Sequence, residues 1–311
     1  MPGMREQLDE LGYVVIRQLL SPDEVAAYRA EVQKVSGLGD ADSGKQVFDC
    51  GDGVTQNPRF WPLIYHTKLV DVIRMLIGPA ARYTQHSDIY VNMASQAAEP
   101  GGKRIGGWHR DSACREFNLG PDWDESREPH QIVRVAIYLQ SYRESHSSLG
   151  VMPGSHRREQ RLSGNDLRLW SRVLDMEYRG RRILWRLGMA DEPIYYHPWF
   201  LQRNEPVRWQ FLSRPTMPVW IKTEPGDCVI FDQRLYHSSS PIVGPKYSVF
   251  LSYSPENEHA RNHIRYYRFF RKDLNYEPIP PELAEILKEH DLYMEVPEPS
   301  EFEGATMPAY S

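Results

Sequence analysis

The stretch that decides the fold of this chain carries two potential metal ligands that are two residues apart. It reads Gly106-Gly107-Trp108-His109-Arg110-Asp111-Ser112. Side chains alternate between the two faces of an extended strand, so His109 and Asp111 are expected to project on the same side. An imidazole and a carboxylate on one face supply two ligands for a transition metal, and a third ligand is then expected from a distant part of the chain.

A second motif, far along the sequence, offers that third ligand. The turn Gly226-Asp227 precedes the apolar residues 228–231, and we expect a hydrophobic strand that ends on His237. Two histidines and one carboxylate, with the remaining metal positions open, form the arrangement of non-haem Fe(II) oxygenases. Either motif alone is weak evidence, because short motifs arise by chance and a histidine at a strand end is more often a surface residue.

Further motifs occur in a consistent order around these two. They are Leu11-Gly12-Tyr13-Val14-Val15-Ile16-Arg17, the segment 149–157 with its Pro153-Gly154-Ser155-His156, and the segment 246–253. From about Leu8 to about Glu258, the series resembles the phytanoyl-CoA dioxygenase family of Fe(II)/2-oxoglutarate-dependent oxygenases. The resemblance implies a double-stranded β-helix whose iron ligands are His109, Asp111 and His237. It also implies 2-oxoglutarate as co-substrate and O2 as oxidant.

The same resemblance implies where 2-oxoglutarate binds. The family usually has an arginine for the distal carboxylate at the start of the last core strand, and this chain has Lys246 there. Lysine offers a point charge instead of a planar fork, and the alternative is an exposed lysine in a turn. Ser239 matches a family position that helps to hold the keto acid. Arg134 and Tyr138, on one side of the strand that follows the His-Xaa-Asp loop, are weaker candidates for the same role.

Composition favours one folded domain. The chain has 311 residues, of which 41% are hydrophobic and 25% charged, so a large core is available. The formal net charge of -5 gives no reason to expect nucleic acid or an anionic membrane as partner. We find no apolar window of 18 residues and no signal peptide. The three scattered cysteines argue against a disulfide framework and favour a reducing cytoplasm.

The pattern along the chain predicts a mainly β fold with flanking helices. Near the N-terminus we expect a strand at 13–16 and a helix that begins with a capping box at Ser21 and Glu24. We expect a loop over 37–60 and a helix over 66–77. Further strands are expected as a pair over 83–93 and at 131–140, 149–152, 219–222, 228–231 and 246–253. Short strands that carry the ligands, with turns between them, indicate a jelly roll.

Residues 157–214 interrupt the strands and form a predicted helical insert. They contain twelve Arg, no Lys and four Trp, against seven Asp or Glu. The segment is a solvated outer layer or a dimer interface, or it is a lid beside the mouth of the barrel. Arg179, Arg182 and Arg186 share one helix face, and arginine suits carboxylate or phosphate, so we hypothesise an anionic substrate. The sequence leaves the oligomeric state open. Residues 278–311 form a C-terminal extension with a short helix at 282–290.

The residues thus favour a dioxygenase that hydroxylates, desaturates or cyclises a small-molecule metabolite or natural-product intermediate, releasing succinate and CO2. Asp111 separates the chain from halogenating relatives, in which a small residue leaves room for chloride. The alternative is a non-catalytic, cupin-like barrel that binds a metal or a ligand, and a hydrolytic zinc enzyme is more distant. Trp108 is expected to pack in the core and His156 to brace its hairpin. The histidines without paired spacing are expected to be ordinary: His86, His130, His146 and His197.

Overall fold

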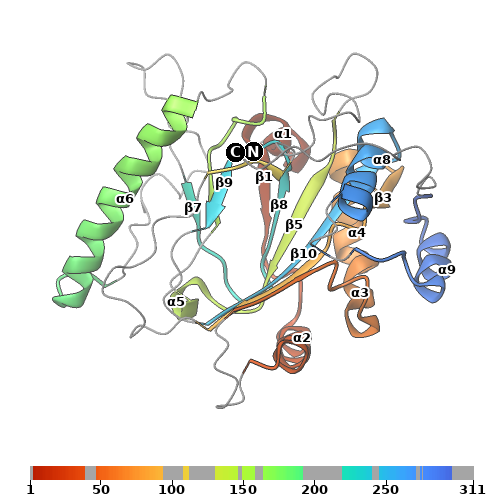
Figure 1. The fold of residues 1–311 in the computed structure, drawn as a ribbon, viewed down its shortest axis with the longest axis horizontal. Helices are drawn as coiled ribbons and strands as arrows, with labels where there is room; N and C mark the ends of the chain where they lie inside the picture. Colours follow the sequence, from red (N-terminus) through yellow and green to blue (C-terminus); the bar gives the residue numbers. More distant parts are fainter. Residues whose placement is uncertain are drawn as a thin grey trace.

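The computed structural model describes residues 3–38, 47–93, 108–111, 130–145, 149–157, 164–191, 219–239, 245–270, 274 and 276–295. Its strands (Figure 1) are β1 Tyr13–Ile16, β2 Val47–Gly51, β3 Ala81–Tyr83, β4 Asp88–Asn92, β5 Val133–Tyr138, β6 Leu149–Val151, β7 Val219–Ile221, β8 Cys228–Asp232, β9 His237–Ser239 and β10 Lys246–Pro255. The α-helices are α1 Met4–Leu11, α2 Pro22–Ser36, α3 Trp61–Ile64, α4 Thr67–Ile77, α5 Tyr142–Ser145, α6 Gly164–Arg186, α8 Glu258–Arg265 and α9 Pro281–Glu289. A 3-10 turn, η1 Pro58–Phe60, precedes α3, and a π-helical turn, η4 Tyr266–Phe270, follows α8.

The strands form two antiparallel sheets. The large sheet has the order β1-β8-β5-β10-β4-β2, with β3 also paired to β10, and the small sheet has the order β7-β6-β9. Apolar side chains from both sheets make one buried cluster, which includes Tyr138 and Phe231 from the large sheet and Leu149 and Val151 from the small one. This is the jelly roll that the sequence predicts.

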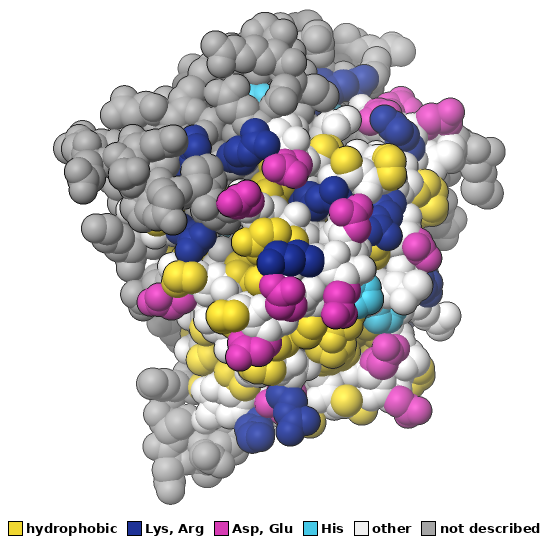
Figure 2. Space-filling view, turned by 90° about the vertical axis from the view of Figure 1, so that its right-hand side faces the viewer, with side chains coloured by type: hydrophobic (Ala, Val, Ile, Leu, Met, Phe, Trp, Pro, Cys, Tyr) yellow, Lys and Arg dark blue, Asp and Glu magenta, His cyan; other side chains and the backbone are white. Residues whose placement is uncertain are grey.

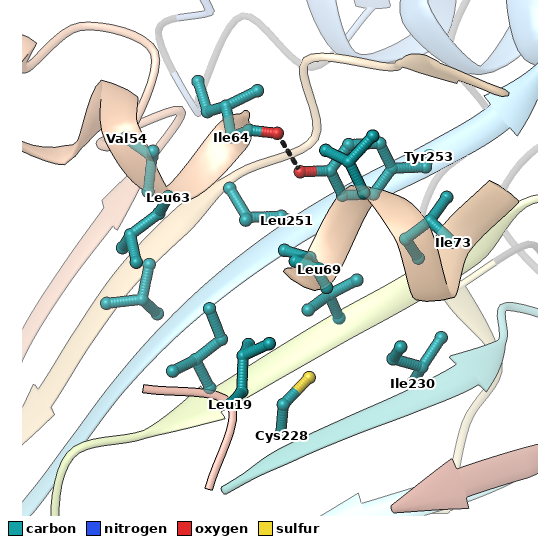
Figure 3. Close-up of a cluster of buried hydrophobic side chains, with 14 of the residues drawn as sticks. Leu19, Val54, Leu63, Ile64, Leu69, Ile73, Cys228, Ile230, Leu251 and Tyr253 are labelled. Carbon is teal, nitrogen blue, oxygen red and sulfur yellow. Dashed lines mark hydrogen bonds between the residues drawn. The ribbon is translucent and has the colours of Figure 1, made fainter. Parts of the chain in front are cut away.

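The outer face of the large sheet is covered by helices. Leu69 and Ile73 of α4 lie against Leu251 and Tyr253 of β10, and the Tyr253 hydroxyl donates to the carbonyl of Ile64 at 2.7 Å (Figure 3). The C-terminal helix α9, predicted at 282–290, adds Leu283 and Leu287 to the same cluster, and α2 adds Val25 and Val32. Burying side chains of this size contributes about 1.5–3 kcal/mol each, so this cluster is the main apolar support of the sheet.

Strand β5 shows why the alternation of side chains in the sequence predicted a strand. Val133, Val135 and Ile137 belong to the cluster under the helices, whereas Ala136 and Tyr138 belong to the cluster between the sheets. Every residue of the strand is buried, including Arg134. A polar residue on the inward face of such a strand must find its partners inside the barrel.

The N-terminal predictions are confirmed. The Ser21 hydroxyl accepts from the amide of Glu24, and the Glu24 carboxylate accepts from the amide of Ser21 at 2.8 Å, which is the predicted capping box. Strand β1 pairs with β8 in antiparallel register, Tyr13 opposite Phe231. The N-terminal segment is therefore an edge strand of the large sheet.

Two predictions about strand limits were wrong. Residues 37–60 do not form only a loop, because β2 lies there and pairs with β4. This strand is at the sheet edge and its residues are partly exposed, so its sequence need not alternate between apolar and polar residues. The strand before His237 ends at Asp232. The amide of Leu235 donates to the carbonyl of Asp232 in a turn, and His237 begins β9 of the other sheet. The chain has to change sheets at this point, and a hydrophobic pattern alone does not reveal such a change.

The outer surface is mixed in character. Figure 2 shows acidic and basic side chains interspersed on the face that carries α9, which lies on the right in Figure 1. On the opposite side, α6 lies beside the small sheet (Figure 1). None of the helices in the described ranges is long and apolar enough to cross a bilayer.

Gly12 offers a test of the contact between the N-terminal segment and the barrel. It ends α1 with φ +80°, and a Cβ there would lie 2.5 Å from Nδ1 of His156 and 2.7 Å from Cδ1 of Leu235. Gly37 ends α2 with φ +60° and has no atom within 4 Å of such a Cβ. Gly37→Ala should cost about 1–2 kcal/mol for the left-handed backbone alone. Gly12→Ala should cost about 1–3 kcal/mol more through overpacking, as measured by urea unfolding. Equal losses of unfolding free energy in the two variants would contradict the close contact of Gly12 with His156 and Leu235.

Candidate active site

The two parts of the predicted metal site are joined by backbone hydrogen bonds. His109 and His237 form an isolated antiparallel bridge. The amide of His109 donates to the carbonyl of His237 at 3.1 Å, and the amide of His237 donates to the carbonyl of His109 at 3.0 Å. The chain around His109 thus extends the small sheet beyond β9. This pairing places the two imidazole rings with their centroids 4.3 Å apart.

Asp111 completes the cluster. Its amide donates to the carbonyl of Gln233 at 3.2 Å, which holds the His-Xaa-Asp segment against the turn between β8 and β9. Its Oδ1 lies 3.5 Å from Nε2 of His237 and 3.9 Å from Nε2 of His109. Burial alone would raise the pKa of Asp111, but the charge and hydrogen bond of His237, together with Arg134, hold it well below its usual range. The carboxylate is therefore ionised and able to bind a cation.

The surroundings of His237 leave its Nε2 available as a ligand. Its Nδ1 lies 3.0 Å from the carbonyl of Leu235. A carbonyl only accepts, so Nδ1 donates to it, and Nε2, which faces Asp111, is the ring nitrogen that a metal would take. A backbone partner of this kind fixes the tautomer and the orientation of metal-binding histidines.

The Pro-Gly-Ser-His turn fixes the backbone next to His237. The hydroxyl of Ser155 accepts from the amide of Tyr236 at 3.0 Å, and the amide of Met152 donates to the carbonyl of Tyr236 at 2.9 Å. His156 itself binds the carbonyl of Asp9 in α1 at 3.1 Å. It therefore braces α1. The sequence had suggested that it braces its own hairpin, and that prediction was wrong.

The cluster fits a metal ion by its chemistry. His109, Asp111 and His237 offer one ligand atom each, all within 4.8 Å of one another. Within the described residues they are the one group of this kind. Two imidazoles and one carboxylate suit iron(II), and the His109 side chain, 58% exposed, leaves the site open on one side. An open side is what a catalytic metal needs for its substrates.

A buried cation lies on the inward face of β10. Lys246 is 5% exposed, and burial lowers its pKa to about 8. Its Nζ lies 5.7 Å from the ring centre of Tyr90 and 6.0 Å from that of Tyr138. Within the described part of the chain, Nζ has no hydrogen bond or ion pair. An ammonium buried without an anion is costly, so the site is suited to a carboxylate brought in by a ligand.

Sequence reasoning missed Ser248. It lies two residues after Lys246 on the same face of β10, opposite Tyr138 in the register, and its fully buried hydroxyl has no partner among the described residues. The alternation of the strand could have identified it, because residues two apart share a face. Lys246, Ser248 and Tyr138 together form a polar end to the barrel interior, which fits the distal carboxylate of 2-oxoglutarate.

The other candidates lie in different places. Ser239 is an exposed residue at the end of β9, on the same side of that strand as His237. Arg134 lies near Asp111, at the opposite end of the interior from Lys246. Trp108 is buried and packs on Trp220 with ring centroids 5.9 Å apart, as predicted. His86 and His130 are buried as well, whereas His146 and His197 lie outside the described residues.

A jelly roll with two histidines and a carboxylate at an open end, and a buried cation inside, defines an Fe(II)/2-oxoglutarate-dependent oxygenase. The family model for phytanoyl-CoA dioxygenase matches residues 8–248. The chain therefore belongs to the phytanoyl-CoA dioxygenase family, with iron and 2-oxoglutarate as its cofactors. The non-catalytic barrel considered from the sequence is thereby disfavoured. No curated protein sequence matches the chain.

Solved structures agree with the fold. The 2-oxoglutarate-dependent carbocyclase SnoK from nogalamycin biosynthesis is 20% identical, with a TM-score of 0.50 over 80% of this chain and 82% of that one. HygX from Streptomyces hygroscopicus, with nickel and 2-oxoglutarate bound, is 15% identical, with a TM-score of 0.50 over 82% and 88%. The epimerase SnoN, in complex with Fe3+, 2-oxoglutarate and nogalamycin RO, is 16% identical, with a TM-score of 0.50 over 81% and 82%.

The metal cluster gives a direct prediction. Replacing His109, Asp111 or His237 by Ala should abolish Fe(II)-dependent turnover of 2-oxoglutarate, because each residue supplies one of three protein ligands. The fold should persist, since the cluster lies at the end of the barrel and outside the apolar core. Succinate release measures turnover, and thermal unfolding checks the fold. Wild-type turnover in a folded His237→Ala variant would exclude this residue as a ligand.

Proposed function

We propose that this oxygenase binds Fe(II) through His109, Asp111 and His237 and binds the distal carboxylate of 2-oxoglutarate through Lys246. One observation carries the proposal: an open cluster of three ligands and a buried, unpaired ammonium lie on the interior surfaces of one barrel. Ser248 and Tyr138 are positioned to donate to the same carboxylate, and Ser239 assists nearer the metal. Residues 1–311, with the insert at 157–214 and the C-terminal extension at 278–311, act as one oxygenase domain in this proposal.

The protein orients the iron and the co-substrate and supplies a buried interior for the co-substrate. When bound, iron and 2-oxoglutarate supply an oxidative decarboxylation that yields succinate and CO2 and oxidises a C–H bond of the substrate. Lys246 fixes one end of the co-substrate, and its burial strengthens the attraction because water is excluded. Asp111 occupies the position at which halogenating relatives hold chloride. Hydroxylation is therefore the favoured outcome, with desaturation or cyclisation as variants of the same oxidation.

The substrate is a small molecule in this proposal. The fold neighbour HygX is described with hygromycin B bound, and SnoN with nogalamycin RO. We propose further that the substrate of this chain carries an anionic group on an apolar or ring-containing body. Support for this comes from α6, which lies in the insert at 157–214.

Helix α6 combines an exposed apolar row with arginines. The row consists of Leu169, Val173, Met176 and Ile183, and Leu187 continues it in the turn that follows the helix. Arg179 and Arg186 are exposed beside it, and Arg182 is half-buried. A helix face that meets only water is normally polar, so this face fits a covering partner. The covering partner is the substrate if the insert is a lid, and a second subunit if it is an interface.

The pH dependence of 2-oxoglutarate binding should report on Lys246. With a pKa of about 8, Lys246 is cationic below pH 8 and becomes neutral above it. The dissociation constant for 2-oxoglutarate should therefore rise above pH 8, by up to about tenfold per pH unit. Anaerobic calorimetry with Fe(II) present measures this. Burial also raises the pKa of the neighbouring phenols of Tyr90 and Tyr138, so these groups do not mimic the effect.

Lys246→Arg is the matched control, because a guanidinium keeps its proton throughout this range. It should bind 2-oxoglutarate without the dependence on pH. Lys246→Ala should weaken binding by about 2 kcal/mol or more, roughly 30-fold, through loss of the charge partner. If Lys246→Ala binds 2-oxoglutarate like the wild type, the distal carboxylate is held elsewhere.

Charge reversal at Arg182 separates the lid from the interface. In a lid, Arg182→Glu should raise KM for the true substrate at least about tenfold, as expected for a lost charged partner, with unchanged 2-oxoglutarate affinity and mass in solution. Arg59→Glu, an exposed reversal on η1, is the control. A change in mass with an unchanged KM would contradict the lid and identify α6 as an interface.

A further inference from the structure

Arg134 lies directly behind the carboxylate of the candidate metal site. It is 5% exposed, on the inward face of β5, and its Nε is 3.7 Å from Oδ2 of Asp111. The other oxygen of Asp111, Oδ1, faces the two histidines at 3.5 and 3.9 Å. The two oxygens of one carboxylate thus have separate surroundings: one faces the ligand cluster and the other a guanidinium.

The guanidinium is held firmly on its other edges. Nη1 donates to the carbonyl of His86 at 2.5 Å and lies 3.4 Å from the hydroxyl of Ser252. Nη2 forms an ion pair with Oδ2 of Asp88. The other oxygen of Asp88 accepts from the hydroxyl of Tyr276 at 3.2 Å. Arg134 is therefore held by His86, by Asp88 of β4 and by Ser252 of β10, while Tyr276 holds Asp88, and little rotamer freedom remains.

The partners of Arg134 are themselves braced. The ring of His86 stacks on Tyr267 of η4 with centroids 3.9 Å apart, and Tyr267 lies 5.1 Å from Tyr276. On the other side of the loop between β3 and β4, the buried carboxylate of Asp52 accepts from Gln85 at 2.9 Å and from Ser87 at 3.2 Å. The loop that presents the His86 carbonyl and Asp88 is therefore rigid.

The charges are arranged so that Arg134 orients Asp111 without taking the place of a metal ion as its partner. Asp88 is the direct ion-pair partner and offsets most of the guanidinium charge. The separation of 3.7 Å from Asp111 is longer than the 2.7–2.9 Å of a charge-assisted hydrogen bond. Asp111 therefore keeps its capacity to bind a cation through Oδ1, while Oδ2 is attracted in the opposite direction.

We infer that Arg134 is a positioning residue for Asp111, which holds Oδ2 away from the cluster so that Asp111 binds the metal through Oδ1 alone. The inference rests on the proposed metal site. Its consequence concerns the number of open metal positions. An aspartate that chelates through both oxygens takes one of the positions needed by 2-oxoglutarate and O2, whereas single-oxygen binding leaves three positions free.

The geometry disfavours the role of 2-oxoglutarate ligand that the sequence suggested for Arg134. In the register of the large sheet, Arg134 lies opposite Ser252, whereas Lys246 is at the other end of β10. The N–H groups of Arg134 already point to His86, Ser252, Asp88 and Asp111. A guanidinium has five N–H donors in a fixed plane, so few remain for a further ligand.

Metal binding tests the inference without turnover. Metal-free protein is titrated with Co(II), in the absence of 2-oxoglutarate, by calorimetry and by its visible absorption spectrum. Arg134→Met should bind Co(II) about 10–100-fold more weakly, the usual effect of losing an outer partner of a metal ligand, and should show an altered cobalt spectrum. At saturating Co(II), its affinity for 2-oxoglutarate should remain within about twofold of the wild type, because a chelating Asp111 takes only the position meant for O2 and leaves those of the keto acid. Lys246→Met is the matched control and should show the reverse pattern.

Two more variants keep the test decisive. Arg134→Met alone leaves the partly buried Asp88 without its partner and risks unfolding, whereas Asp88→Asn combined with Arg134→Met removes both charges together. Arg134→Lys keeps the charge but not the planar fork, and should rescue folding more than cobalt affinity.

The outcomes are distinguishable. Wild-type cobalt affinity and spectrum in the folded double variant overturn the role of Arg134. Loss of 2-oxoglutarate affinity with intact cobalt affinity also overturns it and makes Arg134 a co-substrate ligand. If His237→Ala also binds Co(II) like the wild type, the proposed metal site itself is wrong, and the failure does not concern Arg134 alone.

Discussion

The site depends on a pair of backbone hydrogen bonds between segments that are far apart in the sequence. His109 and His237 exchange amide and carbonyl groups at 3.1 and 3.0 Å. In an antiparallel bridge of this kind the two side chains lie on the same face, so the pairing itself brings the imidazoles together. The turn after β8 then adds Asp111 through the carbonyl of Gln233. Metal ligation in this fold is thus a consequence of how the small sheet closes.

Among the described residues, two buried cations lie in the barrel interior, and they differ in their partners. Arg134 has Asp88 as its own counterion, bound in an ion pair. Lys246 has no such anion among the described residues, and only aromatic faces lie near its ammonium. A buried charge without a partner is destabilising, so the fold carries a cost at Lys246 that the proposed binding of a dicarboxylate would offset. The presence of a protein counterion thus distinguishes Arg134, a structural cation, from Lys246, the cation proposed to bind the co-substrate.

The sequence predicts the strands and the metal ligands because both follow from local periodicity. The period of two in residues 131–140 separates Val135 from Arg134, and the His-Xaa-Asp spacing places two ligands on one face. The partners of Arg134 were not predictable, because Asp88 and Ser252 come from strands that only the sheet order brings together. The split between β8 and β9 was missed for the same reason. A spacing of four in His259, His263 and Tyr267 could have indicated the buried face of α8 and η4, which packs behind His86.

The features that would distinguish this enzyme from others of the same fold lie in the insert and not in the barrel. The barrel provides iron and co-substrate sites that suit many oxidations, and fold alone does not select a substrate. Helix α6 exposes four large apolar side chains in one row, and covering each of them is worth about 1.5–3 kcal/mol when burial is complete. The cost of such a row in water supports the proposal that a partner covers α6. The arginines beside it favour a partner with negative charge, because like charges would repel a basic one. Apolar area and positive charge on one helix are therefore what the proposed substrate, or a second subunit, would meet at α6, independently of the reaction at the metal.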